Sequence, residues 1–371
     1  MMDGNELTSY MSERIDALVS GVLRSSLRDP RETAFLLRFG TSVKKADTIR
    51  RAMEEDGEHV PAFLISSITT SCNLFCKGCY ARANGICGTP LKVEMSADDW
   101  GSVFEQAEGL GIPFNILAGG EPLMRRDVIM RASAMKNTVF PVFTNGTVID
   151  EDYMELFGWC RNLIPVFSIE GDRAHTDGRR GEGTYDMVVG KMGELGKRGL
   201  FFGASVTVMK GCEDVVASED FVMMLHDSGC KIVFFIEFVP VCGDPEGSAP
   251  TEDDRARFRV RLSELRRMYG DMIFMSFPGD EEYLGGCIGA GRGFFHINPY
   301  GDAEACPASP YSDINVREGT LKDVLSSRLF SDIRSEGLLR GEHVGGCILI
   351  DRKDEIQSII DGHTYKNIRS R

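Results

Sequence analysis

The sequence lacks any run of about 18 consecutive apolar residues, the length that a helix needs to cross a bilayer. It also lacks the cationic stretch followed by an apolar stretch that marks a secretory signal. We therefore expect a cytoplasmic protein with no membrane span. Its 371 residues, 42% hydrophobic and 26% charged, suffice for one large α/β domain and an appendage.

Positive charge is scarce in this chain. There are 42 Lys and Arg residues against 56 Asp and Glu residues, which gives a net charge of −14. Such a surface repels nucleic-acid phosphate, so we expect no nucleic-acid partner. The most basic stretch, residues 254–267, distributes its arginines around a helix, which is typical of a solvated face.

The cysteines do not form a disulfide pattern. Their number, 11, is odd, their spacing is irregular, and nothing in the sequence indicates secretion. In a reducing compartment such thiols are more often used for metal binding or redox chemistry. The cysteines therefore become the first candidates for a functional site.

Short apolar runs alternate with helical patterns from about residue 62. The expected strands are 62–68, 114–118, 140–144, 164–169, 201–209 and 232–239. The expected helices lie near 97–109, 125–136, 151–160, 184–198, 214–228 and 252–269. Six βα units predict an α/β fold with a parallel sheet, either open or closed into a partial barrel.

Helical patterns precede this region and a mixed pattern follows it. In residues 1–60, Pro30 opens one expected helix that Gly40 should end, and a second helix should follow. This segment is expected to pack on the main domain; a substrate lid is the alternative. After residue 270 we expect short antiparallel strands at "MIFMSFP", "RGFFHIN" and "DAEACP", then helices over 320–338 and 353–361. The expected domains are 1–60, 61–270 and 271–371.

Polar or glycine-rich signals follow the first four expected strands. They are the cysteine cluster, "GGEP" at 119–122, "TNG" at 144–146 and "SIEGD" at 168–172. The carboxyl ends of parallel strands share one rim, where α/β proteins bind ligands. The sequence therefore predicts a functional site on this rim.

Three of the rim thiols, Cys72, Cys76 and Cys79, have the spacing CX3CX2C. Structural zinc is usually held by four ligands in paired units, and only Cys76 and Cys79 form such a pair. A [4Fe–4S] cube has four irons and is usually held by four thiolates, so three cysteines leave one iron open. The spacing favours the cluster.

These residues resemble the radical S-adenosylmethionine (SAM) superfamily, in which CX3CX2C follows the first strand and a "GGEP" motif follows the second. The resemblance implies a partial (βα)6 TIM-like barrel. It also implies that SAM binds the open iron and is cleaved to a 5′-deoxyadenosyl radical, which abstracts a substrate hydrogen. A reduced ferredoxin or flavodoxin is the implied electron donor.

Further rim residues become candidates for SAM binding. They are Tyr80, Gly119, Gly120, Glu121, Thr144, Asn145, Ser168, Glu170, Ser205 and Thr207. For the polar ones, a turn or capping role is an alternative, and the "SIEG" here replaces a common "SIDG". The loop 171–186 either connects two helices or covers the rim, and Arg180 is a candidate on the substrate side.

A second cysteine set lies in the appendage. Cys287, Cys306 and Cys347, with "GDAEAC" giving GX4C, resemble the SPASM and twitch domains that hold auxiliary Fe–S clusters. The run CX2CX5CX3C of a full SPASM domain is missing, so the resemblance implies one auxiliary [4Fe–4S] cluster. Its fourth ligand is open: a substrate, a residue other than Cys, or the thiol of Cys87 or Cys242. Alternatively, these are ordinary buried cysteines, as we expect for Cys160, Cys212 and Cys230.

Three functions remain at this stage. The first is radical SAM oxidation or cross-linking of a peptide, a cofactor precursor such as a tetrapyrrole, or a lipid. The second is radical SAM group transfer, by methylation or sulfur insertion. The third is a zinc-stabilised binding or regulatory module.

Overall fold

The computed structural model describes residues 30–85, 87–88, 92–241, 247–309, 311–339, 346–361 and 366–367. Residues 1–29 of the expected N-terminal helical segment lie outside these residues, and so does Cys242. No helix among the described residues has the length and apolarity required to cross a membrane.

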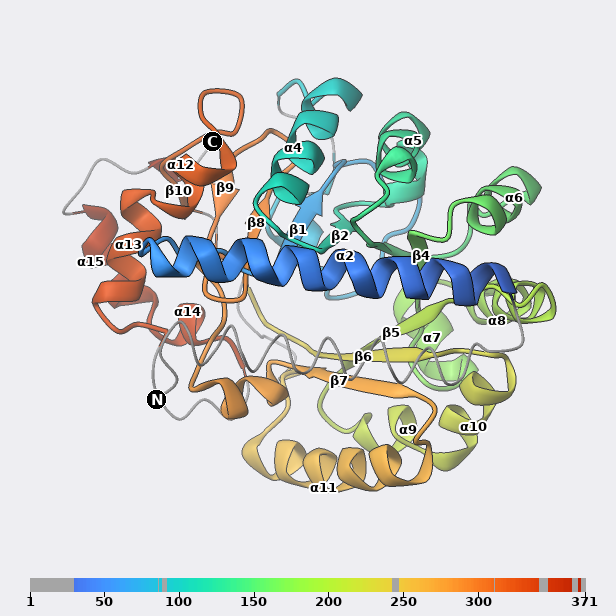
Figure 1. Ribbon diagram of the computed structural model, residues 1–371. Helices are drawn as coiled ribbons and strands as arrows, with labels where there is room; N and C mark the ends of the chain where they lie inside the picture. Colours follow the sequence, from blue (N-terminus) through green and yellow to red (C-terminus); the bar gives the residue numbers. More distant parts are fainter. Residues whose placement is uncertain are drawn as a thin grey trace.

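One curved sheet organises the described chain (Figure 1). Its strands are β1 (Phe63–Ser67), β2 (Phe114–Ala118), β3 (Phe140–Thr144), β4 (Leu163–Ser168), β5 (Gly203–Val208), β6 (Ile232–Glu237), β7 (Ile273–Phe277), β8 (Phe294–Ile297) and β9 (Ala303–Glu304). The order is β7-β6-β5-β4-β3-β2-β1-β8-β9. Strands β1 to β6 are parallel neighbours, so the predicted partial (βα)6 barrel is confirmed.

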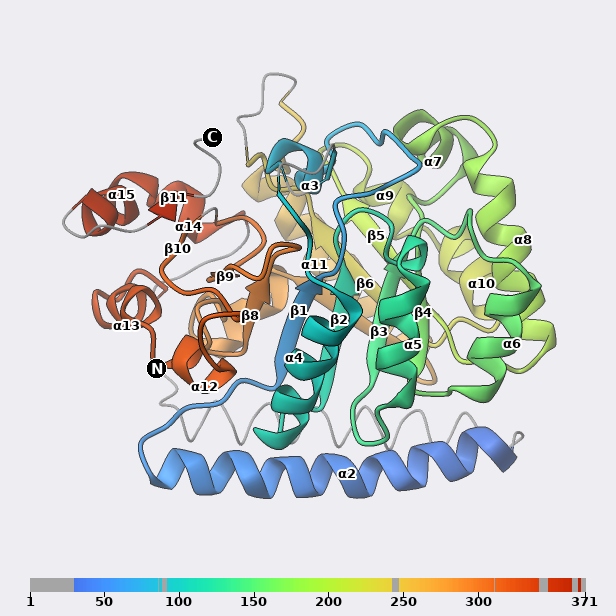
Figure 2. The same cartoon turned by 90° about the horizontal axis from the view of Figure 1, so that it is seen from above.

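Helices cover the outer face of this sheet (Figure 2). They are α4 (Ala97–Gly109), η1 (Pro122–Met124), α5 (Arg126–Ala134), α6 (Glu151–Trp159), α7 (Arg173–Arg180), α8 (Thr184–Lys197), α9 (Glu213–Val216), α10 (Glu219–Asp227) and α11 (Glu252–Met268). Helix α4 shows why they form. Ser96 and Asp99 make the predicted capping box, and Trp100, Phe104 and Ala107 bury one face at helical spacing.

A single long helix, α2 (Pro30–Glu55), lies across the amino-terminal ends of the strands (Figure 2). Phe35, Phe39 and Val43 pack there against residues at the strand starts, such as Phe114 and Ile273. The prediction that Gly40 ends a helix was wrong. The apolar spacing stays in phase across Gly40, and the packing outweighs the roughly 1 kcal/mol that a glycine costs a helix. The lid alternative was also wrong for α2, because this helix lies opposite the cysteine rim.

Two strands run in a direction that the sequence analysis did not expect. Strand β7 pairs in parallel with β6, and β8 pairs in parallel with β1, whereas both were predicted to be antiparallel. The crossover through α11 returns the chain to the same end of the sheet, which makes β7 parallel. The sheet therefore continues past residue 270. Strand β9 pairs antiparallel with β8, as expected for the strands at "RGFFHIN" and "DAEACP".

The remaining elements lie beyond the β9 edge (Figures 1 and 2). They are β10 (Tyr311–Ser312), α12 (Leu321–Leu325), α13 (Arg328–Ser335), α14 (Ile348–Asp351), α15 (Lys353–Asp361) and β11 (Lys366–Asn367). The short helix η2 (Gly279–Leu284) instead follows β7 and contacts it. The predicted helix 320–338 is in fact two helices, because the side chain of Ser327 caps a new start at α13.

Candidate active site at the carboxyl end of the sheet

The first cysteine set occupies the loop between β1 and the short helix α3 (Tyr80–Ala83). The thiols of Cys72 and Cys79 pack against Ala81 and Cys87, and the charges of Cys72 and Cys79 both act on Cys76. A hydrogen bond from Cys87 lowers the pKa of Cys72 to about 6, whereas burial raises the pKa of Cys76. The loop thus brings the three predicted thiols together.

Helix α7 holds this loop from the side. The amide of Lys77 donates to the carbonyl of Arg179 at 2.9 Å, and Nη1 of Arg180 lies 3.9 Å from Sγ of Cys76. Both arginines pair with the carboxylate of Glu170, which is 3% exposed. Although burial opposes ionisation, these guanidinium groups hold the pKa of Glu170 below its ordinary value. The structure therefore joins two predicted site residues, Glu170 and Arg180, to each other, and Arg179 was missed.

The glycines of the "GGEP" turn make room for the cysteine loop. A Cβ on Gly119 would lie 2.5 Å from the Thr69 carbonyl oxygen, and one on Gly120 would lie 2.0 Å from that of Ser71. The amides of Gly120 and Glu121 donate to these same oxygens at 2.8 and 2.7 Å. The two glycines are needed because two backbone segments touch here.

Glu121 links the second and third strand ends. Its carboxylate is 1% exposed and accepts from the Leu123 amide, the Thr144 hydroxyl at 2.7 Å and the Asn145 amide at 2.8 Å. Burial raises the pKa of Glu121 to about 7. The side chain of Asn145 donates to Asn73 inside the cysteine loop. Glu121, Thr144 and Asn145 therefore hold the rim loops together, which is the turn and cap role that the sequence left open.

The remaining predicted SAM contacts lie on neighbouring strands. Ser168 on β4 is paired in register with Ser205 on β5, and Thr207 follows on the same face of β5. Tyr80 begins α3 and remains 39% exposed. Their roles in SAM binding stay predictions.

The second cysteine set is close to the first. Tyr80 interacts electrostatically with Cys79 and also with Cys306, and burial together with these thiols raises the pKa of its hydroxyl. The amide of Asn84, after α3, donates to the Pro307 carbonyl at 2.7 Å. Helix α3 therefore joins the two sets.

Cys287, Cys306 and Cys347 influence one another's charge and lie in or against the main core. Burial raises the pKa of all three thiols. Cys87 instead lies beside Cys72, in the first set. As expected, Cys212 and Cys230 are buried in the core, and Cys160 packs against it.

A buried polar chain beside the site was missed by the sequence analysis. On β8, Nε2 of His296 lies 2.8 Å from Oγ of Ser67, and its Nδ1 lies 2.7 Å from the Glu304 carboxylate. Asn298 donates to the other oxygen of Glu304. No local signal identifies this chain, because Ser67 and His296 are 229 residues apart in the sequence.

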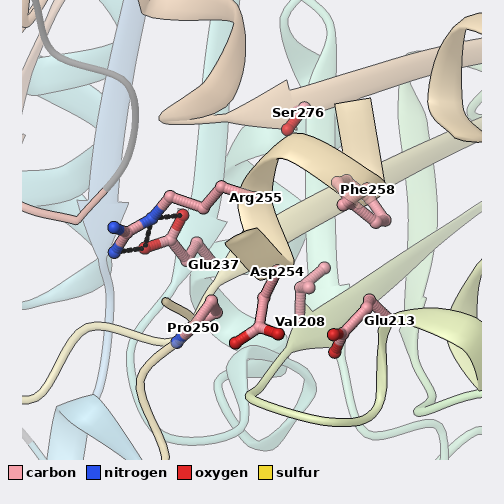
Figure 3. A pocket seen from close by; sticks show the side chains of 8 residues that line it. All are labelled: Val208, Glu213, Glu237, Pro250, Asp254, Arg255, Phe258 and Ser276. Atoms are coloured by element: carbon pink, nitrogen blue, oxygen red, sulfur yellow. Dashed lines mark hydrogen bonds and ion pairs between the residues drawn. The ribbon is translucent and has the colours of Figure 1, made fainter. Parts of the chain in front are cut away.

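A small cavity lies at the carboxyl end of β5 and β6 (Figure 3). Arg255 pairs with Glu237 at 2.7 Å, and Glu237 also accepts from the Gly346 amide at 2.7 Å, next to Cys347. Glu213 and Asp254 line the same cavity. The Glu237 carboxylate therefore attaches Gly346, the residue before Cys347, to the barrel.

The donor set fits the cofactors that the sequence pattern implies. Three thiols share one loop, and none of them is in a disulfide. Among the described residues, no group of three or more His, Cys, Asp or Glu side chains is arranged to hold a single metal ion. A [4Fe–4S] cube does not require its thiolates to converge on one point, because each thiolate binds a different iron.

Residues 66–214, which include the cysteine loop and strands β2 to β5, match the sequence model of the radical SAM superfamily. Members of that superfamily use a [4Fe–4S] cluster and SAM.

The chain is similar to curated proteins that are named for different products. The chain is 26% identical over 182 residues to Fe-coproporphyrin III synthase of Methanosarcina barkeri, covering 48% of this chain and 44% of the relative. It is 24% identical over 220 residues to the sporulation killing factor maturation protein SkfB of Bacillus subtilis, covering 58% and 52%. The matches thus span about half the length of these relatives.

Solved structures share the architecture. Streptococcus suis SuiB bound to S-adenosylmethionine has a TM-score of 0.66 at 19% identity, covering 93% of this chain and 86% of that chain. This likeness extends from the barrel into the described C-terminal part and concerns the fold.

Proposed function

We propose that the protein is a radical SAM enzyme that removes a hydrogen atom from a peptide or a cofactor precursor and releases an oxidised or cross-linked product. The observation that carries this proposal is the convergence of Cys72, Cys76 and Cys79 on the rim of a radical SAM domain. A second buried thiol set lies beside it.

In this proposal Cys72, Cys76 and Cys79 hold a [4Fe–4S] cluster, and the rim from β2 to β5 holds SAM. The bound pair supplies a 5′-deoxyadenosyl radical that abstracts a substrate hydrogen. The residues of the chain fix the geometry. The Glu170 ion pairs and the Glu121 hydrogen bonds hold the loops that carry the thiols. Such fixed placement is what hydrogen transfer over roughly 3–4 Å requires.

Cys287, Cys306 and Cys347 hold an auxiliary cluster in this proposal, as in a twitch-like domain. Such a cluster supplies an acceptor for the electron that remains on the substrate. The short link through Tyr80 and Asn84 between the two sets supports this role. Net oxidation is therefore favoured over group transfer.

The names of two relatives support a substrate class. One of them, by name, makes a coproporphyrin and another matures a killing factor. We therefore propose a peptide or a tetrapyrrole-type cofactor precursor, with a reduced ferredoxin or flavodoxin as electron donor.

The test is anaerobic reconstitution followed by iron counting and reductive cleavage of SAM. The proposal expects about eight irons per chain, for two cubes, and formation of 5′-deoxyadenosine with dithionite. Cys76→Ala should abolish this product and leave about four irons. Cys160→Ala is the matched control and should leave both values unchanged, because Cys160 lies in neither set.

Cleavage that survives in Cys76→Ala would refute the proposal, and zinc in place of iron would favour the binding module. The mass of the product then distinguishes radical SAM oxidation from radical SAM group transfer. Oxidation removes hydrogens, whereas group transfer adds a methyl group or sulfur.

A further inference from the structure

The second cysteine set has three thiols for a cube that usually has four protein ligands. We propose that the carboxylate of Glu281 is the fourth ligand of the auxiliary [4Fe–4S] cluster, opposite the thiolates of Cys287, Cys306 and Cys347. This inference rests on the proposed function, because it requires that the auxiliary cluster exists.

Glu281 is built into the loop that carries Cys287. It lies in η2, six residues before this cysteine, and is 2% exposed. Its Oε1 accepts from the Ile288 amide at 3.2 Å, and its main-chain carbonyl accepts from the Gly286 amide at 3.2 Å. The carboxylate therefore lies against the backbone directly after Cys287, and the main chain of Glu281 is bonded to the residue directly before it.

The other thiols approach the same place from distant segments. The amide of Ala290 donates to the Ala305 carbonyl at 2.9 Å, which lays the loop after Cys287 along the residues before Cys306. The charge of Glu281 acts on Cys287, on Cys306 and on Cys347. One carboxylate is thus within electrostatic reach of all three thiols.

This placement is unfavourable without a cation. A buried carboxylate costs several kcal/mol unless it is paired or fully hydrogen-bonded. Other buried glutamates of this chain meet that need: Glu170 lies between two arginines, and Glu304 binds His296 and Asn298. Among the described residues, no Lys or Arg side chain forms an ion pair with Glu281. The charge of Arg292 acts on Glu281, and this guanidinium donates to the carbonyls of Cys287 and Leu284.

An iron centre would supply the missing positive charge. Carboxylate oxygen is a common protein ligand of iron and other metals, although it is harder than thiolate. Replacing thiolate ligands by less electron-donating ones raises the reduction potential of an iron–sulfur centre, as histidine does in Rieske centres. A Glu281 ligand therefore predicts an auxiliary cluster with a higher potential than an all-cysteine one.

The structure disfavours the other protein candidate that it describes. The thiol of Cys87 packs with Cys72 in the first set and is hydrogen-bonded to it. A substrate-bound iron remains the competing arrangement. It would leave Glu281 without any role in cluster binding.

The test uses the full chain in which Cys72, Cys76 and Cys79 are replaced by Ala, so that only the second site can load iron. This background protein should bind about four irons after anaerobic reconstitution. Binding of none would refute the auxiliary cluster itself, and this failure is separate from the ligand assignment.

Three variants on this background then test the ligand. Glu281→Gln should lose about one iron in four and give the electron paramagnetic resonance signal of a [3Fe–4S] cluster. Glu281→Cys should keep four irons and lower the midpoint potential. The control Glu213→Gln changes another buried glutamate, 4% exposed and paired with Arg257 outside the cluster, and should change neither value.

Glu281→Gln with four irons and an unchanged potential would overturn the assignment. Circular dichroism shows whether each variant is folded. If Glu281→Gln does not fold, Glu281→Cys decides alone: an unchanged potential would exclude Glu281 as a ligand, because a ligand exchange must shift it.

Discussion

Among the glycines that the structure describes, Gly120 is the one at which an added Cβ would come closest to another atom. In Gly120→Ala the new Cβ would lie 2.0 Å from the Ser71 carbonyl oxygen. Separations under 3.0 Å essentially never occur, so the two backbones must move apart by about 1 Å. This movement breaks or stretches the hydrogen bonds from Gly120 and Glu121 to the cysteine loop, 2.8 and 2.7 Å long.

The magnitude follows from these contacts. Overpacking costs about 1–3 kcal/mol, and each lost hydrogen bond costs about 0.5–1.5 kcal/mol. We expect Gly120→Ala to lower the free energy of unfolding of the iron-free protein by about 2–6 kcal/mol, measured by urea denaturation. Because Ser71 precedes Cys72, the variant should also load about four fewer irons than the wild type.

Gly190→Ala is the matched control. Gly190 lies within α8, and a Cβ there would meet no atom within 4 Å. Alanine favours a helix over glycine by about 1 kcal/mol, so this variant should be slightly more stable and bind iron normally. If Gly120→Ala matches Gly190→Ala in stability and iron content, the reasoning about loop contact is wrong.

Two further predictions concern buried carboxylates. Glu170→Gln leaves Arg179 and Arg180 buried without a counter-charge, so the iron-free protein should lose about 3–5 kcal/mol in urea denaturation. Glu151→Gln removes an exposed partner of Arg198 and should change little; equal losses would contradict the argument. Glu121 has its pKa raised from 4.5 to about 7 by burial, so the folded state binds its proton more tightly than the unfolded state. The resulting stability is present at low pH and is lost as the pH rises to about 7, by roughly 3 kcal/mol. Glu121→Gln should remove this loss between pH 5 and 8, and parallel stability curves for the two proteins would refute it.

The barrel strands could be predicted because their limits are local. Strand β2 was predicted with its observed bounds, Phe114–Ala118, since Pro113 and Gly119 flank a short apolar run. Strand direction at β7 and β8 could not be predicted in this way. It depends on which distant edge each strand reaches, and β8 pairs with β1, more than 200 residues earlier.

In the site, too, the features set by local sequence could be predicted, and those set by long-range packing could not. The spacing of Cys72, Cys76 and Cys79 identified the site on the rim. The alternation of strands and helices predicted that the glycine turn lies on the same rim. The contact of His296 with Ser67 depends on packing between segments 229 residues apart. Glu281 carries no motif, and only its burial near three thiols makes it a candidate.

Helix α2 has a consequence for folding during synthesis. Ile273 packs against the apolar cluster that includes Phe39, so the apolar face of α2 leaves the ribosome more than 200 residues before the last described residue of this cluster. At roughly 5–20 residues per second this delay lasts on the order of ten to forty seconds. Contacts of such long range also slow folding. Helix α2, which covers the amino-terminal ends of the strands, is thus synthesised before the strands of this sheet. It completes its packing only after β7 has been made.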